Sequence, residues 1–217
     1  MVILAIVLLL VGAYLCGSVP TGFLVAKGAK GIDIRDYGSG GTGATNVLRT
    51  VGKEAALIVF LIDLGKGLLA VLLVRAIFPD LLAAFPDSSL TPDWQPWLEM
   101  SAGLLALVGH SRSIWLGFTG GKSVAAGLGV LFALAWTVAL AAMGIFAITL
   151  TLSRIVSLSS IGAALGTIVL MVVTGQPLAY ISLVVLGGVY VIVRHRSNIQ
   201  RLWAGTEPRL GQSTTKA

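Results

Sequence analysis

The chain has 217 residues, of which 56% are hydrophobic and only 11% are charged. A soluble domain of this length needs roughly a quarter of its residues charged to cover its surface. The composition therefore excludes soluble enzymes and disordered chains and indicates an integral membrane protein. The single cysteine, Cys16, has no partner for an internal disulfide, which excludes a disulfide-stapled scaffold. The net charge of +6 comes from basic residues whose placement follows membrane sidedness, so it does not indicate nucleic-acid binding.

Uncharged hydrophobic runs predict the membrane spans. The first run, residues 2–25, is long enough to cross the hydrocarbon as one helix and too long for a signal-peptide core. A polar, glycine-rich loop at residues 27–53 follows it. The segment 79–96, rich in proline and aspartate, is predicted to be a non-helical loop in water. The predicted single spans are residues 2–25, 55–78, 97–118, 161–174 and 178–193.

The uncharged run at residues 123–152 is too long for one ordinary crossing and short for two, and the distribution of basic residues decides between them. A single crossing moves the basic residues of the carboxyl-terminal part to the side opposite the earlier loops, against the positive-inside rule. With two crossings, all Lys and Arg except Lys66 and Arg75 fall on one side. These residues are Lys27, Lys30, Arg35, Arg49, Lys53, Arg112, Lys122, Arg154, Arg194, Arg196, Arg201, Arg209 and Lys216.

The predicted fold class is thus all-α and integral to the membrane. We expect a seven-helix transmembrane bundle with the amino terminus outside and the carboxyl terminus in the cytoplasm. Residues 1–205 form a single polytopic domain and residues 206–217 a cytoplasmic tail. Within the spans, Asp63 and Lys66 are three residues apart on one helix and would be costly if unpaired, so we expect a mutual ion pair.

Four polar clusters fall on the predicted cytoplasmic side. The first, residues 38–46 followed by Arg49, combines glycines with Ser, Thr and Asn, so its backbone amides and a helix start can hold a phosphate. It also matches a dinucleotide-binding pattern, but no βαβ unit surrounds it and the acidic residue 20 positions beyond Gly43 lies in a membrane helix. A flexible glycine turn remains the alternative.

The other clusters carry cations and hydroxyls as well. Residues 109–112 precede residues 120–123, where Lys122 lies at a helix start but no P-loop is formed, and a membrane-edge loop is an equal alternative there. Residues 153–160 contribute an arginine and four serines. Residues 194–198 contain His195, the candidate for proton transfer, although a helix cap is its commoner role. His110 is expected to be structural.

The motifs of residues 38–40 and 43–46 with Arg49, of residues 120–122, and of His195 with Asn198 together resemble one family over nearly the whole chain. This is the bacterial acyl-phosphate-dependent glycerol-3-phosphate acyltransferase family (PlsY). The resemblance implies a seven-helix enzyme without metal or other cofactor. It implies transfer of a fatty acyl group from acyl phosphate to glycerol 3-phosphate, giving 1-acylglycerol 3-phosphate (lysophosphatidic acid) and phosphate, the first step of phospholipid synthesis.

The resemblance also implies the site residues. The expected catalytic residues are Ser39, Arg49, Lys122, His195 and Asn198. The expected substrate-binding residues are Gly40, Gly43, Thr45, Asn46, Gly120, Gly121, Ser157 and Glu207. We expect a monomer in contact with membrane lipid, multi-pass in the bacterial inner (cytoplasmic) membrane.

Two positions depart from the family pattern, which usually has asparagine at the place of Gly41 and lysine at the place of Thr119. These departures bear on substrate affinity more than on reaction type. The H-x-x-x-x-D pattern of acyl-CoA-dependent acyltransferases is absent. The base that deprotonates the attacking hydroxyl stays open between His195 and a phosphate oxygen of the substrate, and we expect no covalent enzyme nucleophile.

Two other function classes fit part of the pattern. A membrane carrier for a small phosphorylated solute also needs cations and glycine loops, but it predicts polar groups at mid-membrane and on both faces. A non-catalytic membrane interaction protein does not need four polar clusters on one face. Both classes explain the sequence less completely than an acyltransferase does.

Overall fold

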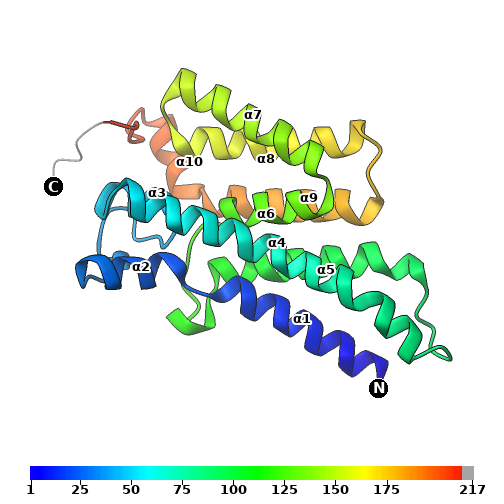
Figure 1. The fold of residues 1–217 in the computed structure, drawn as a ribbon. Helices are drawn as coiled ribbons and strands as arrows, with labels where there is room; N and C mark the ends of the chain where they lie inside the picture. Colours follow the sequence, from blue (N-terminus) through cyan, green and yellow to red (C-terminus); the bar gives the residue numbers. More distant parts are fainter. Residues whose placement is uncertain (212–217) are drawn as a thin grey trace.

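A computed structural model describes residues 1–211 of the chain, and over this range it is helical, with one isolated β-bridge between Ser113 and Thr119 (Figure 1). Lys216 and the second half of the predicted tail, residues 212–217, lie outside the described residues. The α-helices are α1 (Val2–Ser18), α2 (Thr21–Lys30), α3 (Ala44–Thr50), α4 (Lys53–Ala84), α5 (Gln95–Ser111), α6 (Val124–Leu134), α7 (Trp136–Ser153), α8 (Val156–Val173), α9 (Leu178–Arg194) and α10 (Arg196–Trp203). Short 3₁₀ turns are η1 (Ile34–Asp36), η2 (Pro92–Trp94) and η3 (Ile114–Leu116).

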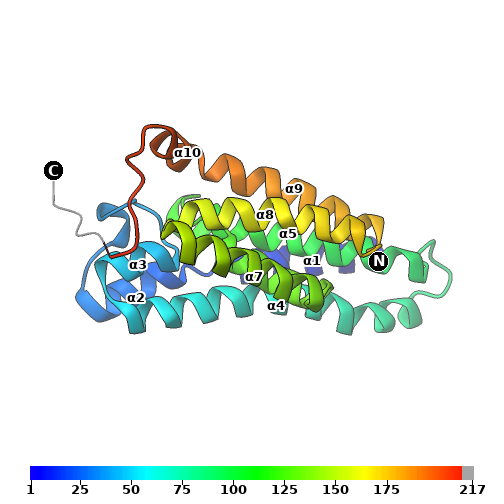
Figure 2. The same cartoon turned by 90° about the horizontal axis from the view of Figure 1, so that it is seen from above.

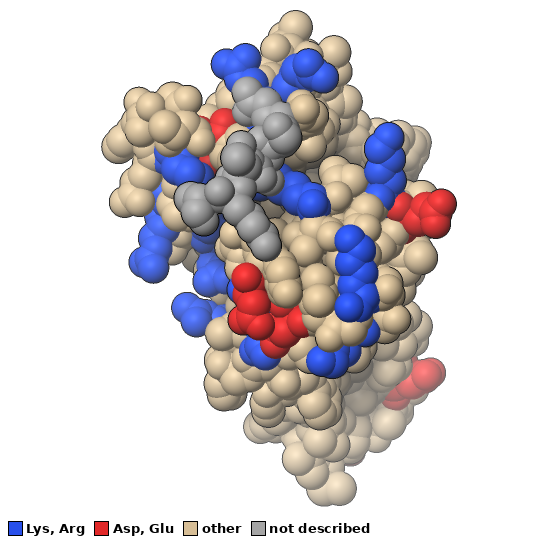
Figure 3. Space-filling view, turned by 90° about the vertical axis from the view of Figure 1, so that its left-hand side faces the viewer, with Lys and Arg blue, Asp and Glu red and all other residues tan. Residues whose placement is uncertain are grey.

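The long helices lie side by side, and the short helices α2, α3 and α10 gather at one end of the bundle (Figures 1 and 2). The amino terminus lies at the opposite end in both views. Lys and Arg side chains crowd the end that carries the short helices (Figure 3). The polar clusters, which are far apart in the sequence, therefore meet at a single end of the bundle.

The first predicted span is interrupted, which the hydropathy of residues 2–25 does not reveal. Helix α1 ends at Ser18 and α2 begins at Thr21. The interruption follows from Pro20, which lacks an amide hydrogen and disfavours the helical conformation at Val19. The Nζ of Lys66 donates a hydrogen bond to the freed Val19 carbonyl at 2.9 Å. Helix α4 thus contacts the break directly, where the Val19 carbonyl also accepts the Thr21 amide at 3.0 Å.

The prediction that residues 79–96 are entirely non-helical is wrong at their beginning. Helix α4 continues through Pro79 to Ala84. Proline inside a helix removes one hydrogen bond, but Phe78 is fully buried and Leu82 packs against the same hydrophobic cluster. Burial of these two side chains offsets the loss and extends the helix.

The long run at residues 123–152 forms two helices, α6 and α7, that meet at Ala135, as a double crossing requires. Among residues 1–211, four helical spans are long and apolar enough to cross a membrane, and five if α9 and α10 count as one bent span. Helix α6 has 11 residues and reaches only about 16 Å. The count of seven crossings and the sidedness of the termini therefore stay predictions.

Glycines allow α6 to pack directly on α4. A Cβ at Gly67 would overlap the Ala126 carbonyl, and a Cβ at Gly129 would overlap the Leu64 carbonyl. This reciprocal contact brings the two backbones together, as small residues do in membrane bundles. It fixes the start of α6, and with it the loop that carries Lys122, against α4.

Candidate active site

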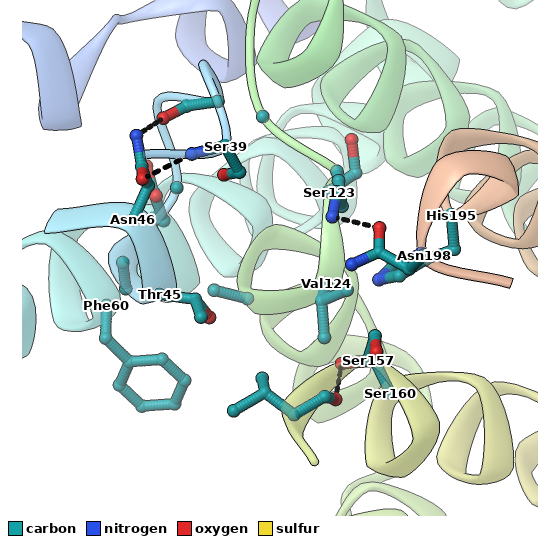
Figure 4. Close-up of a pocket in the computed structure, with 18 of the residues that line it drawn as sticks. Ser39, Thr45, Asn46, Phe60, Ser123, Val124, Ser157, Ser160, His195 and Asn198 are labelled. Atoms are coloured by element: carbon teal, nitrogen blue, oxygen red, sulfur yellow. Dashed lines mark hydrogen bonds between the residues drawn. The ribbon is translucent and has the colours of Figure 1, made fainter. Parts of the chain in front are cut away.

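The polar clusters enclose a cavity of about 150 Å³ at the end of the bundle where the short helices lie (Figure 4). Its walls come from the glycine-rich loop and α3, from α4, from the loop before α6, from α7 and α8, and from the α9–α10 junction with the segment beyond it. The predicted site residues that line it are Ser39, Gly43, Thr45, Asn46, Arg49, Gly121, Lys122, Ser157, His195, Asn198 and Glu207. Gly40 and Gly120 do not line it.

Asn46 shapes the glycine-rich loop. Its Nδ2 donates to the carbonyls of Tyr37 and Gly41, each at 2.9 Å, and to that of Ile34 at 3.2 Å. Its Oδ1 accepts the Ser39 amide at 3.0 Å. Since both ends of this buried amide are engaged within the loop, Asn46 holds the loop in shape beside the cavity. Its contact with substrate stays a prediction.

Gly40 has a backbone role in the same loop, which explains why it is absent from the cavity wall. Its φ is +68°, in the left-handed region where glycine has no steric cost. Gly38 has a φ of +60°, and a Cβ there would overlap the Asn46 side chain. These two glycines permit the turn that presents Ser39.

Lys122 and Arg49 are the cations of the cavity. Lys122 Nζ donates to Asn198 Oδ1 at 2.5 Å (Figure 4). Burial is the largest cause that lowers the pKa of Lys122 to about 8; the charge of Glu207 opposes it and the neighbouring arginines add to it. Arg49 is exposed on α3 and has no hydrogen-bond or ion-pair partner within residues 1–211. The cavity therefore presents an unneutralised guanidinium and a partly buried ammonium.

Glu207 organises the opposite wall. Its Oε1 accepts Asn198 Nδ2 at 2.6 Å and Ser157 Oγ at 2.7 Å, and its Oε2 accepts Arg201 Nε at 2.7 Å. Burial alone would raise the pKa of Glu207, but these hydrogen bonds outweigh it and the pKa lies below its usual range. Asn198 thus has its oxygen toward Lys122 and its amide toward Glu207, so one network joins α8, α10 and the lysine loop.

His195 ends α9 with a neutral ring. Its Nδ1 donates to the Val191 carbonyl at 2.8 Å, which assigns the proton to Nδ1 and leaves Nε2 as a lone-pair acceptor. Burial is the largest cause that lowers the pKa of His195 to about 4; the hydrogen bond to Val191 opposes it, and the charges of Lys122 and Arg194 add to it. At neutral pH the ring is therefore uncharged, and its Nε2 carries no proton, as a base requires.

Gly120 and Gly121 are close-approach positions. The Gly121 amide donates to the His110 carbonyl at 3.2 Å. A Cβ at Gly120 would overlap the same carbonyl, and a Cβ at Gly121 would overlap the His110 imidazole at Nε2. Gly120 thus packs closely against α5, and its expected substrate role stays a prediction.

Several cavity residues have no signature in the sequence. Phe60 on α4, Phe146 on α7, Val124 on α6 and Val156 on α8 form an apolar wall. Nothing distinguishes them from other apolar residues of the spans before the fold is known. Asp63 and His110 also reach the cavity, although the sequence favours structural roles for them over direct chemistry. The predicted ion pair is confirmed, with Lys66 Nζ at 2.9 Å from Asp63 Oδ1.

The relatives of the chain share its whole length. The family model for glycerol-3-phosphate acyltransferase matches residues 7–205. Proteins of that name from Trichormus variabilis and Acaryochloris marina are 55% and 56% identical, over 94% of this chain and 91% and 92% of their own lengths. Two crystal structures of the integral membrane glycerol 3-phosphate acyltransferase PlsY (YgiH) are also similar. The glycerol 3-phosphate form has a TM-score of 0.82 at 36% identity and the lysophosphatidic acid form 0.80 at 35%, each covering 95% of this chain and 96% of the other.

The matched residues 7–205 include all the residues that line the cavity except Glu207. The chain belongs to the glycerol-3-phosphate acyltransferase family.

Proposed function

We propose that this chain transfers a fatty acyl group from acyl phosphate to glycerol 3-phosphate, giving lysophosphatidic acid and phosphate. The observation that carries the proposal is one cavity with two unlike walls. Arg49 and Lys122 lie on its polar side, and the aromatic rings of Phe60 and Phe146 belong to its apolar side. The family membership and the glycerol 3-phosphate and lysophosphatidic acid forms of the PlsY neighbours support the acceptor and the product.

The polar wall suits two phosphorylated substrates. Charge-assisted hydrogen bonds from guanidinium and ammonium to phosphate are the strong ones, and none of the Arg49 donors has an acceptor among residues 1–211. The backbone turn that Asn46 holds adds a concave surface at Ser39 and Gly43. The apolar wall can contact the hydrocarbon chain of the donor, acyl phosphate, while the polar wall contacts its phosphate.

The transfer needs positioning and one proton acceptor. The glycerol hydroxyl oxygen attacks the acyl carbonyl carbon, an ester C–O bond forms, and the bond from that carbon to the phosphate oxygen breaks. Phosphate leaves with the electron pair of the broken bond, and the hydroxyl proton passes to the base. Acyl phosphate is a mixed anhydride with a good leaving group, so placement and charge neutralisation by Arg49 and Lys122 supply most of the acceleration.

Two groups can serve as the base: His195 Nε2 and a phosphate oxygen of the substrate. If His195 is the base, His195→Ala lowers kcat by roughly a hundredfold or more. If the substrate phosphate is the base, the rate falls as pH drops through about 6, where a phosphate monoester takes up its second proton, and this limb persists in His195→Ala. The pH profile of both proteins separates the two.

The donor test is direct. Purified protein is incubated with glycerol 3-phosphate and either acyl phosphate or acyl-CoA, and lysophosphatidic acid is measured. Product from acyl phosphate alone supports the proposal, and product from acyl-CoA alone overturns it. With acyl phosphate and no acceptor, no acylated enzyme should accumulate; a stoichiometric acyl-serine at Ser39 or Ser157, found by mass spectrometry, would overturn direct transfer.

We further propose a monomer in a bacterial inner membrane, with the cavity open to the cytoplasm. The gathering of basic side chains at the cavity end supports this sidedness (Figure 3). In a Cys16-free background, single cysteines at Thr119, which is exposed in the connection between α5 and α6, and at Ser153 should be labelled from the cytoplasmic side and one at Asp87 from the outside. Labelling of Thr119 and Ser153 from opposite sides contradicts the double crossing.

The alkaline side of the pH profile should report Lys122, which lies in a loop outside the spans. With its pKa lowered to about 8, chiefly by burial, the ammonium is present at lower pH and is lost as pH rises through that value. Since kcat/KM reports the free enzyme, we expect it to fall with an apparent pKa near 8. Lys122→Arg keeps its charge throughout and should remove this limb. An unchanged limb in Lys122→Arg assigns it to another group.

A further inference from the structure

Asp63 is a buried carboxylate with hydrogen-bonding capacity left over. It is 1% exposed, its Oδ1 lies 2.9 Å from Lys66 Nζ, and its Oδ2 has no hydrogen-bond partner among residues 1–211. It lines the cavity from α4. A buried polar oxygen without a partner is costly, so its retention beside a candidate active site calls for a reason other than packing.

A second buried carboxylate on the neighbouring helix shows what a purely structural ion pair looks like in this bundle. Glu99 is also 1% exposed, and its two oxygens accept Arg75 Nε at 2.9 Å and Nη2 at 2.7 Å. Gln95 and the Tyr180 hydroxyl complete it at 3.0 and 2.6 Å. This pair is saturated and does not line the cavity. Asp63 differs from it in both respects.

His110 connects Asp63 to the lysine loop. Its Nδ1 lies 3.6 Å from Asp63 Oδ1, and its side chain is 5% exposed. The opposite edge of the ring, at Nε2, abuts the Cα of Gly121, and the His110 carbonyl accepts the Gly121 amide at 3.2 Å. The residue that follows Gly121 is Lys122. One imidazole therefore separates a charged group of α4 from the peptide that carries the phosphate-binding cation.

Asp63 is itself held in place by Lys66, on the same helix. Lys66 Nζ binds both Asp63 and the Val19 carbonyl at the α1–α2 break, at 2.9 Å each. Lys66 therefore has a second anchor, and the carboxylate cannot move without disturbing three helices. The chain of contacts runs from the α1–α2 break through Lys66, Asp63 and His110 to the turn before Lys122.

We propose that Asp63 and His110 are positioning residues for Lys122: the anchored carboxylate orients the imidazole, and the imidazole sets the place of the Gly120–Gly121 turn. The proposal rests on the phosphate-binding role proposed for Lys122. A misplacement of about 1 Å by residues away from the chemistry can cost on the order of a hundredfold in rate. Neither Asp63 nor His110 needs to touch substrate for this effect.

The first experiment neutralises each ion pair as a unit, so that no unpaired charge is left in the membrane. Asp63→Asn/Lys66→Met should lower kcat/KM at least about tenfold. Arg75→Met/Glu99→Gln, the matched control at the ion pair that joins α4 to α5, should stay within about twofold of wild type even where its Tm in detergent falls. Equal kcat/KM in the two double variants at comparable Tm overturns the proposal.

The second experiment tests the contact through His110. Gly121→Ala should lower both Tm and kcat/KM because its methyl overlaps the ring. His110→Ala should lower kcat/KM about tenfold or more. In Gly121→Ala/His110→Ala the methyl enters the vacated space, so Tm rises above that of Gly121→Ala and the losses are not additive. Additive losses in both Tm and kcat/KM overturn the link.

A third background separates this proposal from the proposed function. If His110 acts through Lys122, then His110→Ala added to Lys122→Ala should lower the remaining rate by no more than about twofold. A full multiplicative loss contradicts positioning through Lys122. If wild-type protein makes no lysophosphatidic acid at all, the proposed function fails, whereas the Tm of the Gly121 and His110 variants still decides the contact.

Discussion

Lys122→Ala should lower kcat/KM for glycerol 3-phosphate by about a hundredfold or more, with the bundle still folded. A hundredfold loss corresponds to about 2.7 kcal/mol of transition-state stabilisation, within the range of a charge-assisted hydrogen bond to phosphate in a partly dehydrated site. Because Lys122 Nζ donates to Asn198, the alanine also leaves that amide without its donor. Steady-state kinetics with both substrates, beside Tm in detergent, measures the effect.

The matched control is Lys53→Ala. Lys53 begins α4 at the same end of the bundle, is exposed and does not line the cavity, so its loss should change kcat/KM by no more than about twofold. Arg49→Ala should resemble Lys122→Ala, since within the described part of the chain Arg49 has no hydrogen-bond or ion-pair partner to stabilise through its charge. Near-normal kinetics in either cavity variant would remove that residue from the phosphate site.

Glu207→Ala should cause a loss of similar size by a different route. The carboxylate accepts hydrogen bonds from Asn198, Ser157 and Arg201, and its removal leaves three donors unsatisfied at the wall of the cavity. We expect kcat/KM to fall about a hundredfold and Tm to fall as well. Glu207→Gln keeps an acceptor for Asn198 and Ser157 but faces Arg201 without a charge, so it should lie between wild type and Glu207→Ala.

Glu54→Ala serves as the control for this series. Glu54 is an exposed carboxylate in the first turn of α4 at the same end of the molecule. Its replacement should leave kcat/KM unchanged within about twofold. If Glu207→Ala behaves like Glu54→Ala, the hydrogen-bond network does not support catalysis.

Membrane spans are the part of the fold that hydropathy predicts well, since apolar length decides them. The break at Pro20 and the continuation past Pro79 depend on contacts outside the run. Lys66 supports the first and the burial of Phe78 supports the second. The same proline signal therefore ends one helix and is overridden in another.

The site was predictable where a residue type carries chemistry and the topology brings its segment to the cavity end. Arg49, Lys122 and Asn198 meet both conditions. Phe60 and Phe146 could not be predicted, because an apolar side chain in a membrane span has no distinguishing pattern. In the sequence, Gly40 and Gly120 are equally compatible with a phosphate-binding loop and with a turn or a close-packing position. The backbone role of Gly40 follows only from its φ, and the packing role of Gly120 only from the atoms beside it.

Asp63 shows a further limit of sequence patterns. Its spacing to Lys66 predicts the ion pair, which is confirmed, but spacing along one helix does not say what lies across from it. The cavity and the imidazole of His110 come from segments whose positions depend on the reciprocal glycine contacts between α4 and α6. The contact of Asp63 with His110 and with the cavity therefore depends on tertiary packing, which the spacing along one helix does not predict.

The position of Glu207 in the chain has a consequence for biosynthesis. It follows α10, so a ribosome completes every described helix before it adds the acceptor that joins Ser157 on α8 to Asn198 on α10. A nascent chain can thus insert and pack its bundle while the cavity still lacks its closing wall. Chains released before Glu207 would carry all the described helices without this acceptor, and we expect them to be no more active than Glu207→Ala.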